Sequence, residues 1–349
     1  MVLVVERKTA VPVEAAFSVI LPTADRPIYL RDALQSVRAQ SAVGRIGEII
    51  VSENAGNRQS EKICAEFPDL PIVYRFRDPP IPRMQHYSTT LNEARYSLSA
   101  FLFDDDWWMP DHLMSAWEAL RDHPEASAYG STCYYIEQES GFPVLWEDRL
   151  LMWMASGFGS FDQPWVINCR DLVKAFMART PVLYSTMVGR TDTMREAIKI
   201  HSSRNPYDND RQFFFELSKY GPVIFVPHPE VMYRFHASND QHSFSKADIR
   251  RFARQTTEWL IDYCEAEGIA VRDDLESAFD HCPRAMLRPL LSLFNEGPVD
   301  AMRVRGILPW QLDSFLRRRR WVWIYHLLMP PFLANVASRV VRLLRRKSA

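Results

Sequence analysis

The first hundred residues alternate short apolar runs with segments of helical spacing, and this alternation limits the folds open to the chain. Apolar runs closed by turn-forming residues are typical of buried strands. Strands that alternate with helices are joined by right-handed crossovers and form a mostly parallel sheet. The sequence therefore predicts an α/β protein with a Rossmann-like sheet flanked by helices. The strands are expected at residues 17–22, 48–51, 72–76 and 99–103, and the helices at 28–40, 60–67 and 87–96.

The loops that follow three of these strands are expected to share one cleft. In open α/β sheets, ligands bind beyond the carboxyl ends of the strands. The loops in question are residues 22–27, 52–57 and 104–110.

The second half of the chain has a less regular pattern. Helices are expected at 111–123 and 210–220, with a strand at 223–226 and a loop at 227–243, while 125–200 is mixed and aromatic. From Lys246 onward the pattern turns helical. We therefore expect two parts, 1–245 and 246–349.

Composition excludes several classes of protein. The chain has 42 basic and 43 acidic side chains, so its overall charge gives no reason to expect nucleic-acid binding. It has 12 glycines but neither GxGxxG after a strand nor GxxxxGK, which argues against dinucleotide-fingerprint and P-loop proteins. Its five cysteines are widely separated and lack a CxxC pair, so neither a disulfide framework nor a cysteine zinc site is expected.

The chain also carries no obvious membrane-crossing or secretory signal. Glu6, Arg7 and Lys8 interrupt the apolar start where a signal peptide needs an unbroken run. No stretch of about 18 apolar residues runs uninterrupted. We therefore expect the protein to be cytoplasmic.

Three adjacent carboxylates, Asp104, Asp105 and Asp106, follow the apolar run at 99–103 and precede two tryptophans. Solvated runs of acids are common on protein surfaces, so a structural role stays open. A strand end is, however, a rigid place for the oxygen ligands that Mg²⁺ or Mn²⁺ prefers. The run thus points to a divalent-metal site that would also meet substrate phosphates.

Five segments taken together resemble the family 2 glycosyltransferases. These are enzymes of the GT-A fold that move a sugar from a nucleotide donor with inversion at its anomeric carbon. The likeness covers about residues 16–243 and does not reach the last hundred residues. The segments are Val19-Ile-Leu-Pro-Thr-Ala-Asp-Arg26, Glu48-Ile-Ile-Val-Ser-Glu-Asn54, Phe103-Asp-Asp-Asp-Trp-Trp-Met-Pro110, Asp208-Asn-Asp-Arg-Gln-Phe-Phe-Phe-Glu-Leu217 and Tyr233-Arg-Phe-His236.

The resemblance implies a nucleotide site at the first two loops. Pro22, Thr23 and Arg26 match the loop that wraps the base and ribose, and Asp104 would lie near the ribose. Glu53 stands where the family usually has an Asp that contacts the base, which leaves the identity of the base open.

The resemblance also implies the metal ligands. Asp105 or Asp106 would face the metal that bridges the diphosphate, and which of the two does so stays open. His236 would be a further ligand of the metal or of the phosphates, although a lone loop histidine is more often structural. The expected cofactor is Mn²⁺ or Mg²⁺.

Asp210 opens a predicted helix, where an acid can simply stabilise the helix dipole. The resemblance implies instead that it is the general base that deprotonates the acceptor hydroxyl, with Asp208 as the weaker candidate.

Contacts with the acceptor and with the donor phosphates are assigned less firmly. Ser185, Thr186 and Arg190 lie where the family often contacts the acceptor. Arg83 could pair with donor phosphates, although a surface arginine is the more common case.

The end of the chain is strongly basic. Residues 301–349 hold eleven Lys and Arg residues and one acid, Asp313, so residues 1–300 carry the compensating negative charge. Arg317–Arg320 precede an aromatic segment, and residues 332–347 combine one apolar helical face with further arginines. This pattern is typical of a helix on an anionic membrane surface, or of a helix packed on the acidic body or on a second subunit.

The protein is expected to be a metal-dependent inverting glycosyltransferase that acts on a lipid-linked saccharide acceptor in bacterial surface-polysaccharide synthesis. It is expected to lie peripherally on the inner face of the cytoplasmic membrane. A nucleotidyltransferase with a similar metal site and a non-catalytic membrane-bound scaffold subunit are the alternatives. Whether the chain forms a homo-oligomer is left open.

Overall fold

The computed structural model describes residues 2–6, 15–137, 143–145, 154, 157–178, 182–201, 209–236, 239 and 245–269. Contacts divide the chain into two units, Met1–Ser292 and Leu293–Ala349, and every described residue belongs to the first. The basic amphipathic segment predicted near the carboxyl end lies outside the described residues.

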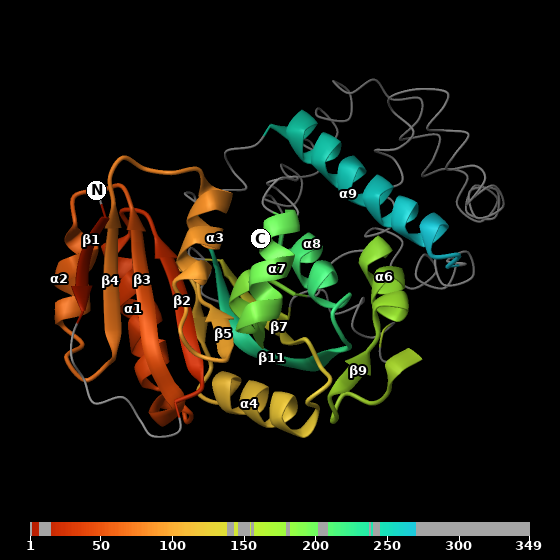
Figure 1. Ribbon diagram of the computed structural model, residues 1–349, viewed down its shortest axis with the longest axis horizontal. Coiled ribbons are helices and arrows are strands. Elements are labelled where there is room, and N and C mark those ends of the chain that lie inside the picture. Colours follow the sequence, from red (N-terminus) through yellow and green to blue (C-terminus); the bar gives the residue numbers. More distant parts are fainter. Residues whose placement is uncertain are drawn as a thin grey trace, which may run out of the picture. The chain divides into compact units, whose positions relative to one another are not determined.

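Within the described part, the strands form one sheet of order β1-β4-β3-β2-β5-β10-β7-β11-β6, with β8 beside β7 and β9 beside β11 (Figure 1). Their bounds are β1 Val2–Glu6, β2 Phe17–Thr23, β3 Ile46–Asn54, β4 Ile72–Arg77, β5 Leu98–Phe101, β6 Trp107–Trp108, β7 Ala128–Glu137, β8 Pro143–Leu145, β9 Trp165–Ile167, β10 Met187–Arg190 and β11 Val223–Phe235.

The four central strands β4, β3, β2 and β5 are parallel, as the alternation of strands and helices predicted. Val19 of β2 pairs with Ile49 on one side and with Ala100 on the other. Strand β10 lies antiparallel between β5 and β7, and β7 and β11 are again parallel. The predicted α/β class with a mostly parallel central sheet is confirmed.

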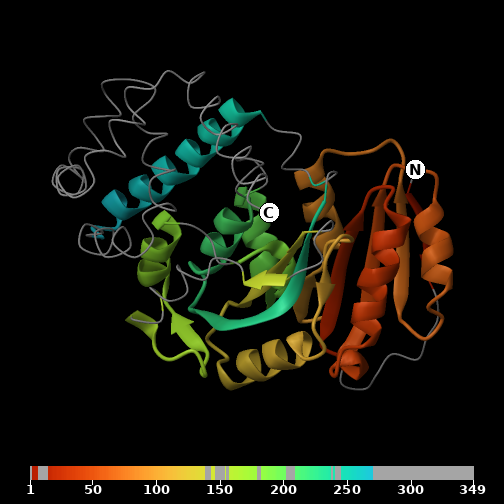
Figure 2. The same ribbon diagram turned by 180° about the vertical axis from the view of Figure 1, so that it is seen from behind.

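The helices cover both faces of the sheet (Figures 1 and 2). Val19 and Leu21 of β2 belong to a buried apolar cluster with Leu30 and Leu34 of α1, and alternation along the strand turns Ile20 to the opposite face. The helices are α1 Pro27–Arg38, α2 Gln59–Ala65, α3 Arg83–Asn92, α4 His112–Asp122, α6 Cys169–Ala178, α7 Thr191–His201, α8 Asn209–Leu217 and α9 Lys246–Ala266; the 3-10 turns are η1 Val43–Arg45 and η2 Tyr184–Thr186.

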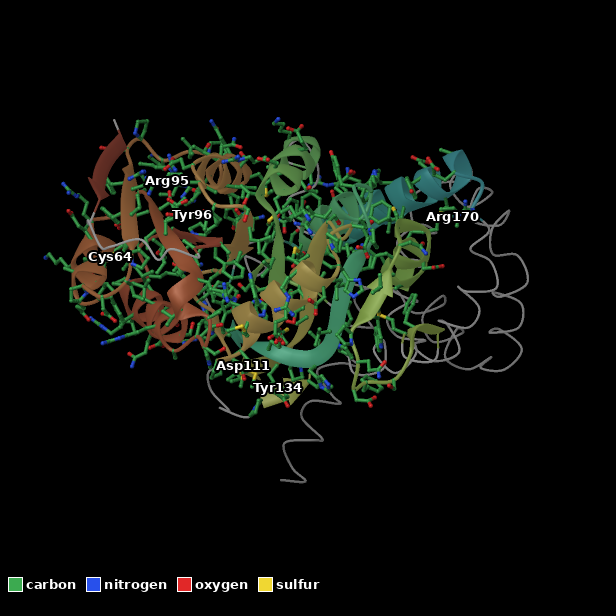
Figure 3. All side chains as sticks on the ribbon, turned by 60° about the horizontal axis from the view of Figure 1, so that its bottom comes forward. Cys64, Arg95, Tyr96, Asp111, Tyr134 and Arg170 are labelled. Atoms are coloured by element: carbon green, nitrogen blue, oxygen red, sulfur yellow. The ribbon has the colours of Figure 1, made fainter. Side chains whose placement is uncertain are left out.

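The segment between α3 and β5 closes the amino-terminal end of the central strands, where Arg95 and Tyr96 are labelled in Figure 3. The ring of Tyr96 lies on Gly47, and a Cβ at Gly47 would come within 2.1 Å of that ring. Glycine is therefore required there by space rather than by backbone conformation.

The loop predicted at 227–243 is wrong for residues 227–235, because β11 continues to Phe235. After an irregularity at Pro229, Val231–Phe235 pair with Cys133–Glu137 of β7. Proline is tolerated at such a bulge. This extension carries β11 to the cleft, since it ends directly before His236.

Helix α9 agrees with the helical pattern predicted from Lys246 onward. The rings of Trp259 and Tyr263 pack edge-on against Phe215 of α8, with centroids 5.0 Å away in both cases. The predicted boundary at 245 stays a prediction. Among the described residues, no helix is long and apolar enough to cross a bilayer.

Candidate active site

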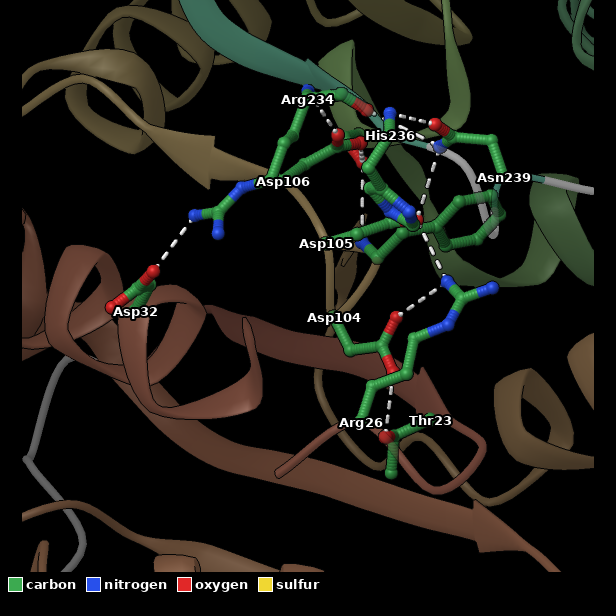
Figure 4. Close-up of polar contacts among 11 residues, drawn as sticks. Thr23, Arg26, Asp32, Asp104, Asp105, Asp106, Arg234, His236 and Asn239 are labelled. Carbon is green, nitrogen blue, oxygen red and sulfur yellow. Dashed lines mark hydrogen bonds and ion pairs between the residues drawn. The ribbon is translucent and has the colours of Figure 1, made fainter. Parts of the chain in front are cut away.

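The three acids lie between β5 and β6, at the carboxyl end of the parallel strands. Asp104, Asp105 and Asp106 are only 4%, 6% and 2% exposed. A solvated surface run, the structural alternative, would leave them open to water. The three side chains point in different directions and meet different elements (Figure 4).

Asp104 faces the loop that follows β2. Thr23 Oγ1 donates a hydrogen bond to Asp104 Oδ2 at 2.7 Å, and Arg26 Nη1 lies 3.3 Å from Oδ1. The loops at 22–27 and 104–110 therefore meet at this end of the sheet.

Asp105 joins the two halves of the sheet. One of its oxygens, Oδ2, accepts from Arg26 Nη1 at 2.7 Å and lies 3.1 Å from His236 Nε2. Asn239 Nδ2 approaches the same oxygen at 3.4 Å. Arg26 follows β2 and His236 follows β11, so a single carboxylate connects the ends of both strands.

Asp106 turns toward the second half of the domain. Its Oδ2 accepts from Ser185 Oγ at 2.5 Å, and its Oδ1 accepts from the backbone N–H of Arg234 at 3.2 Å. Trp108 Nε1 donates to the carbonyl of Ser185 at 2.7 Å, which fixes the 3-10 turn that carries the serine.

The acidic run is short of positive charge. Burial and the charge of Asp105 raise the pKa of Asp104 to about 7, against the opposing effect of Arg26. The same two causes raise the pKa of Asp106 well above its ordinary value. A cation placed beside the run would relieve both penalties, because it favours the ionised carboxylates.

The donor types suit a hard divalent cation, but the side chains do not form a ready-made metal site. Carboxylate oxygens and an imidazole nitrogen are suitable ligands, and Asp105 and His236 already approach each other. Both oxygens of Asp106, however, accept hydrogen bonds from other groups. Within the part of the chain that the structure describes, no three His, Cys, Asp or Glu side chains are grouped so as to hold a metal ion.

Glu53, which the resemblance aligns with a base-contacting acid, is fully buried in this structure. It is 0% exposed, its Oε2 accepts from the Tyr74 hydroxyl at 2.5 Å, and burial raises its pKa. Gly56, at φ +114°, passes over it, and a Cβ at Gly56 would come within 2.7 Å of Glu53 Oε1. The loop at 52–57 therefore covers the carboxylate and lies beside Asp25 of the first loop.

Asp210 is the second residue of α8 and is partly exposed. Burial is the main cause of the raised pKa of the Tyr184 hydroxyl, and the negative charge of Asp210 raises this pKa further. The positive charge of Arg83 lowers the same pKa. The ring of Tyr184 stacks on Phe103, directly before the acidic run, with centroids 5.3 Å apart. Asp210 and Arg83 therefore both lie within electrostatic range of the Tyr184 hydroxyl. Asp208 lies outside the described residues.

Comparisons with known proteins agree with this arrangement. Residues 18–182 match the model of glycosyl transferase family 2, and this range includes the loops at 22–27 and 52–57 and the acidic run. Over this range the chain is similar to glycosyl transferase family 2. The match ends before His236 and Asp210, whose roles depend on the geometry described above.

Solved structures share the fold of this chain. The crystal structure of S. aureus TarS residues 1–349 in complex with UDP-GlcNAc has a TM-score of 0.54 at 14% identity, covering 80% of this chain and 79% of that one. A crystal structure of S. aureus TarS has a TM-score of 0.53 at 14% identity, covering 76% of this chain. The chain spans 43% of the length of that second protein. The GT-A fold is therefore confirmed.

The three residues expected to contact the acceptor are buried or bound to backbone carbonyls in this structure. Ser185 and Thr186 are 0% exposed. Arg190 donates to the carbonyls of Ala126 and Pro124 beyond the end of α4, at 2.9 and 2.8 Å. Contact of these side chains with an acceptor stays a prediction. Pro22, which was expected to wrap the nucleotide, is buried at the end of β2 beside Thr23.

The sequence did not point to Asn239 or to the side chain of Arg234. Asn239 is 6% exposed, donates to the carbonyl of Arg234 at 3.2 Å and accepts from the backbone N–H of His236. It therefore shapes the turn that presents His236 to Asp105. An asparagine three residues after a histidine was the only sequence signal, and such spacing is too common to be informative.

Proposed function

We propose that the protein is an inverting glycosyltransferase that transfers a sugar from a nucleotide-sugar donor to a hydroxyl of a saccharide acceptor. The observation that carries the proposal is the grouping of buried carboxylates at the carboxyl end of the parallel strands, together with a partly exposed carboxylate at the start of α8. Asp104 meets the loop after β2, Asp105 meets both Arg26 and His236, and Asp210 begins a helix on the other side. The family match supports the class of reaction.

In the proposed reaction, Asp210 takes the proton from the acceptor hydroxyl. The hydroxyl oxygen forms a bond to the anomeric carbon while the bond from that carbon to the diphosphate oxygen breaks. The configuration at the anomeric carbon therefore inverts, and no covalent enzyme intermediate is needed. A carboxylate that is partly exposed at a helix start can reach an acceptor, which a fully buried one cannot.

Charge on the departing diphosphate must be offset. Arg26 already places its guanidinium at the acidic run and can pair with phosphate oxygens when it leaves Asp105. We further propose that Mn²⁺ or Mg²⁺ is held by Asp105 or Asp106 together with His236. When bound, such an ion supplies Lewis-acid stabilisation of the leaving group.

The experiment uses the full chain and a panel of nucleotide sugars that begins with UDP-GlcNAc, the ligand of one similar structure. Each donor is tested with Mn²⁺, with Mg²⁺ and with EDTA, together with saccharide acceptors. Nucleotide release and the anomeric configuration of the product are followed by NMR. We expect a nucleoside diphosphate and an inverted product, with loss of turnover in EDTA.

Asp210→Asn is the decisive variant, with Asp192→Asn as its matched control. Asp192 also lies in the first turn of a helix, α7, but its side chain is 95% exposed and pairs with Arg195. Transfer should fall by about 10³-fold in Asp210→Asn and stay unchanged in Asp192→Asn. Equal activity of the two variants would remove Asp210 as the base. Release of pyrophosphate would indicate a nucleotidyltransferase, and no donor consumption at all would favour a scaffold.

We also propose that the basic carboxyl-terminal segment binds an anionic membrane surface, which would bring the enzyme to a lipid-linked acceptor in bacterial surface-polysaccharide synthesis. Its eleven Lys and Arg residues against one acid support this. Flotation with anionic liposomes should carry the full chain upward but not a chain that ends at Pro309. Equal flotation of the two would rule the segment out as the anchor.

A further inference from the structure

The side chain of Arg234 connects β11 to α1 at the edge of the site. Its guanidinium lies over the ring of Tyr29 at 4.5 Å and over that of Trp107 at 4.8 Å. Its Nη2 pairs with Asp32 Oδ2 at 2.7 Å. The side chain is only 14% exposed, so the two aromatic faces offset part of the cost of burying the charge. Three elements, β11, α1 and β6, are joined by this one side chain.

The main chain of the same residue contacts the acidic run. The N–H of Arg234 donates to Asp106 Oδ1 at 3.2 Å, and its carbonyl accepts from Asn239. Two residues later, His236 lies 3.1 Å from Asp105 and packs on the ring of Tyr29 with centroids 4.8 Å apart. A shift in the end of β11 would therefore move the partners of two site carboxylates together.

We propose that Arg234 is a positioning residue of the glycosyltransferase: held between Tyr29 and Trp107 and oriented by Asp32, it fixes the end of β11 so that its own N–H meets Asp106 and His236 meets Asp105. This inference rests on the proposed function for its effect on turnover. Misplacement of a reacting group by about 1 Å can cost on the order of 100-fold in rate, so a side chain that never touches the substrate can still control catalysis.

The test compares two ion pairs made by neighbouring residues of α1. Asp32 pairs with Arg234, whereas Arg31 pairs with Glu66 away from the site, at 2.7 Å in both cases. The variants are Arg234→Met, Arg234→Lys and Asp32→Asn, with Glu66→Gln as the matched control. Lysine keeps the charge but cannot stack a planar group on the two rings.

We expect kcat to fall about 30-fold in Arg234→Met, about 10-fold in Arg234→Lys and about 5-fold in Asp32→Asn, with less than about a 2-fold change in Glu66→Gln. Asp32→Asn should add nothing further in the Arg234→Met background, because the pair acts as one unit. Melting temperatures should stay within about 3 °C of the wild type.

Hydrogen exchange of residues 231–236, measured by mass spectrometry on the protein without donor or metal, gives a second readout. It should be faster in Arg234→Met and unchanged in Glu66→Gln. If Arg234→Met matches Glu66→Gln in exchange, or exchanges faster without losing kcat, the inference is wrong. If the wild type itself consumes no donor, the proposed function fails, and the exchange measurement still decides whether Arg234 holds the strand end.

Discussion

The two ends of the parallel sheet both hold buried carboxylates, but with different surroundings. At the amino-terminal end, Glu48 of β3 is 1% exposed. Its Oε1 accepts from Ser18 Oγ and from the backbone N–H of Arg95, both at 2.6 Å, and its Oε2 accepts from Arg95 Nε at 2.7 Å. One negative charge is thus matched by three donors, one of them a cation.

At the carboxyl end, three carboxylates share a single nearby guanidinium among the described partners, that of Arg26. The pKa values of Asp104 and Asp106 are raised as a result of burial and of Asp105. The difference teaches that burial alone does not mark a functional acid. A buried carboxylate satisfied by the chain stabilises the fold, whereas like-charged carboxylates left short of positive charge mark a place for a ligand.

The largest effect should come from the central acid of the site. Asp105→Asn removes the charge that connects Arg26 with His236, and transfer should fall by about 10³-fold, because the loop after β2 and the end of β11 lose their common partner. The free energy of unfolding should not fall, since one of three repelling charges is removed. Initial rates measure the transfer activity, and urea unfolding measures the free energy of unfolding. A large loss of stability would show that Asp105 is structural, as Glu48 is.

Glu48→Gln should show the opposite result. The substitution leaves the Arg95 guanidinium without its carboxylate and weakens two further bonds, so we expect a loss of about 2–3 kcal/mol in the free energy of unfolding. The kcat of the folded fraction should match the wild type, because the cleft is at the other end of the strands. A fall in kcat comparable to that of Asp105→Asn would break the comparison.

The sequence predicted the first half of the fold well because its information is local. Short apolar strands such as 17–22 need no distant partner to be recognised, and parallel order then brings the loops at 22–27 and 104–110 together. Strand β11 beyond Val226 could not be predicted, because its pairing with β7, about 100 residues earlier, overrides two prolines. The directions of the three acids also depend on distant partners, such as Ser185 for Asp106 and His236 for Asp105.

The pH dependence of stability should show a further difference between the carboxylates at the two ends of the sheet. The pKa of Asp104 is raised to about 7 from an ordinary value of 3.8, so the folded state keeps a proton that the unfolded state releases. The stabilising effect of this proton is present below about pH 4 and lost as pH rises through 7. Asp104→Asn should abolish that loss of stability. In metal-free buffer at pH 8, the free energy of unfolding of the variant should exceed that of the wild type by about 2 kcal/mol. Urea unfolding at several pH values between 4 and 8 measures the free energy of unfolding of both proteins. If this free energy depends on pH in the same way in the variant and the wild type, the raised pKa of Asp104 is contradicted.

The smallest effect is expected at Gly56, which covers a further buried carboxylate at the cleft end. Gly56→Ala places a Cβ within 2.7 Å of Glu53 Oε1 at a φ of +114°, so the loop must shift. We expect a loss of about 1–2 kcal/mol in the free energy of unfolding. If the loop contacts the nucleotide and not the acceptor, as the resemblance implies, the KM for the donor should rise about 5-fold with kcat unchanged. Gly44→Ala is the matched control, since no atom lies within 4 Å of its Cβ position. If both variants bind the donor equally well, the loop at 52–57 is not part of the nucleotide site, and the cleft is formed by the loops at 22–27 and 104–110 without it.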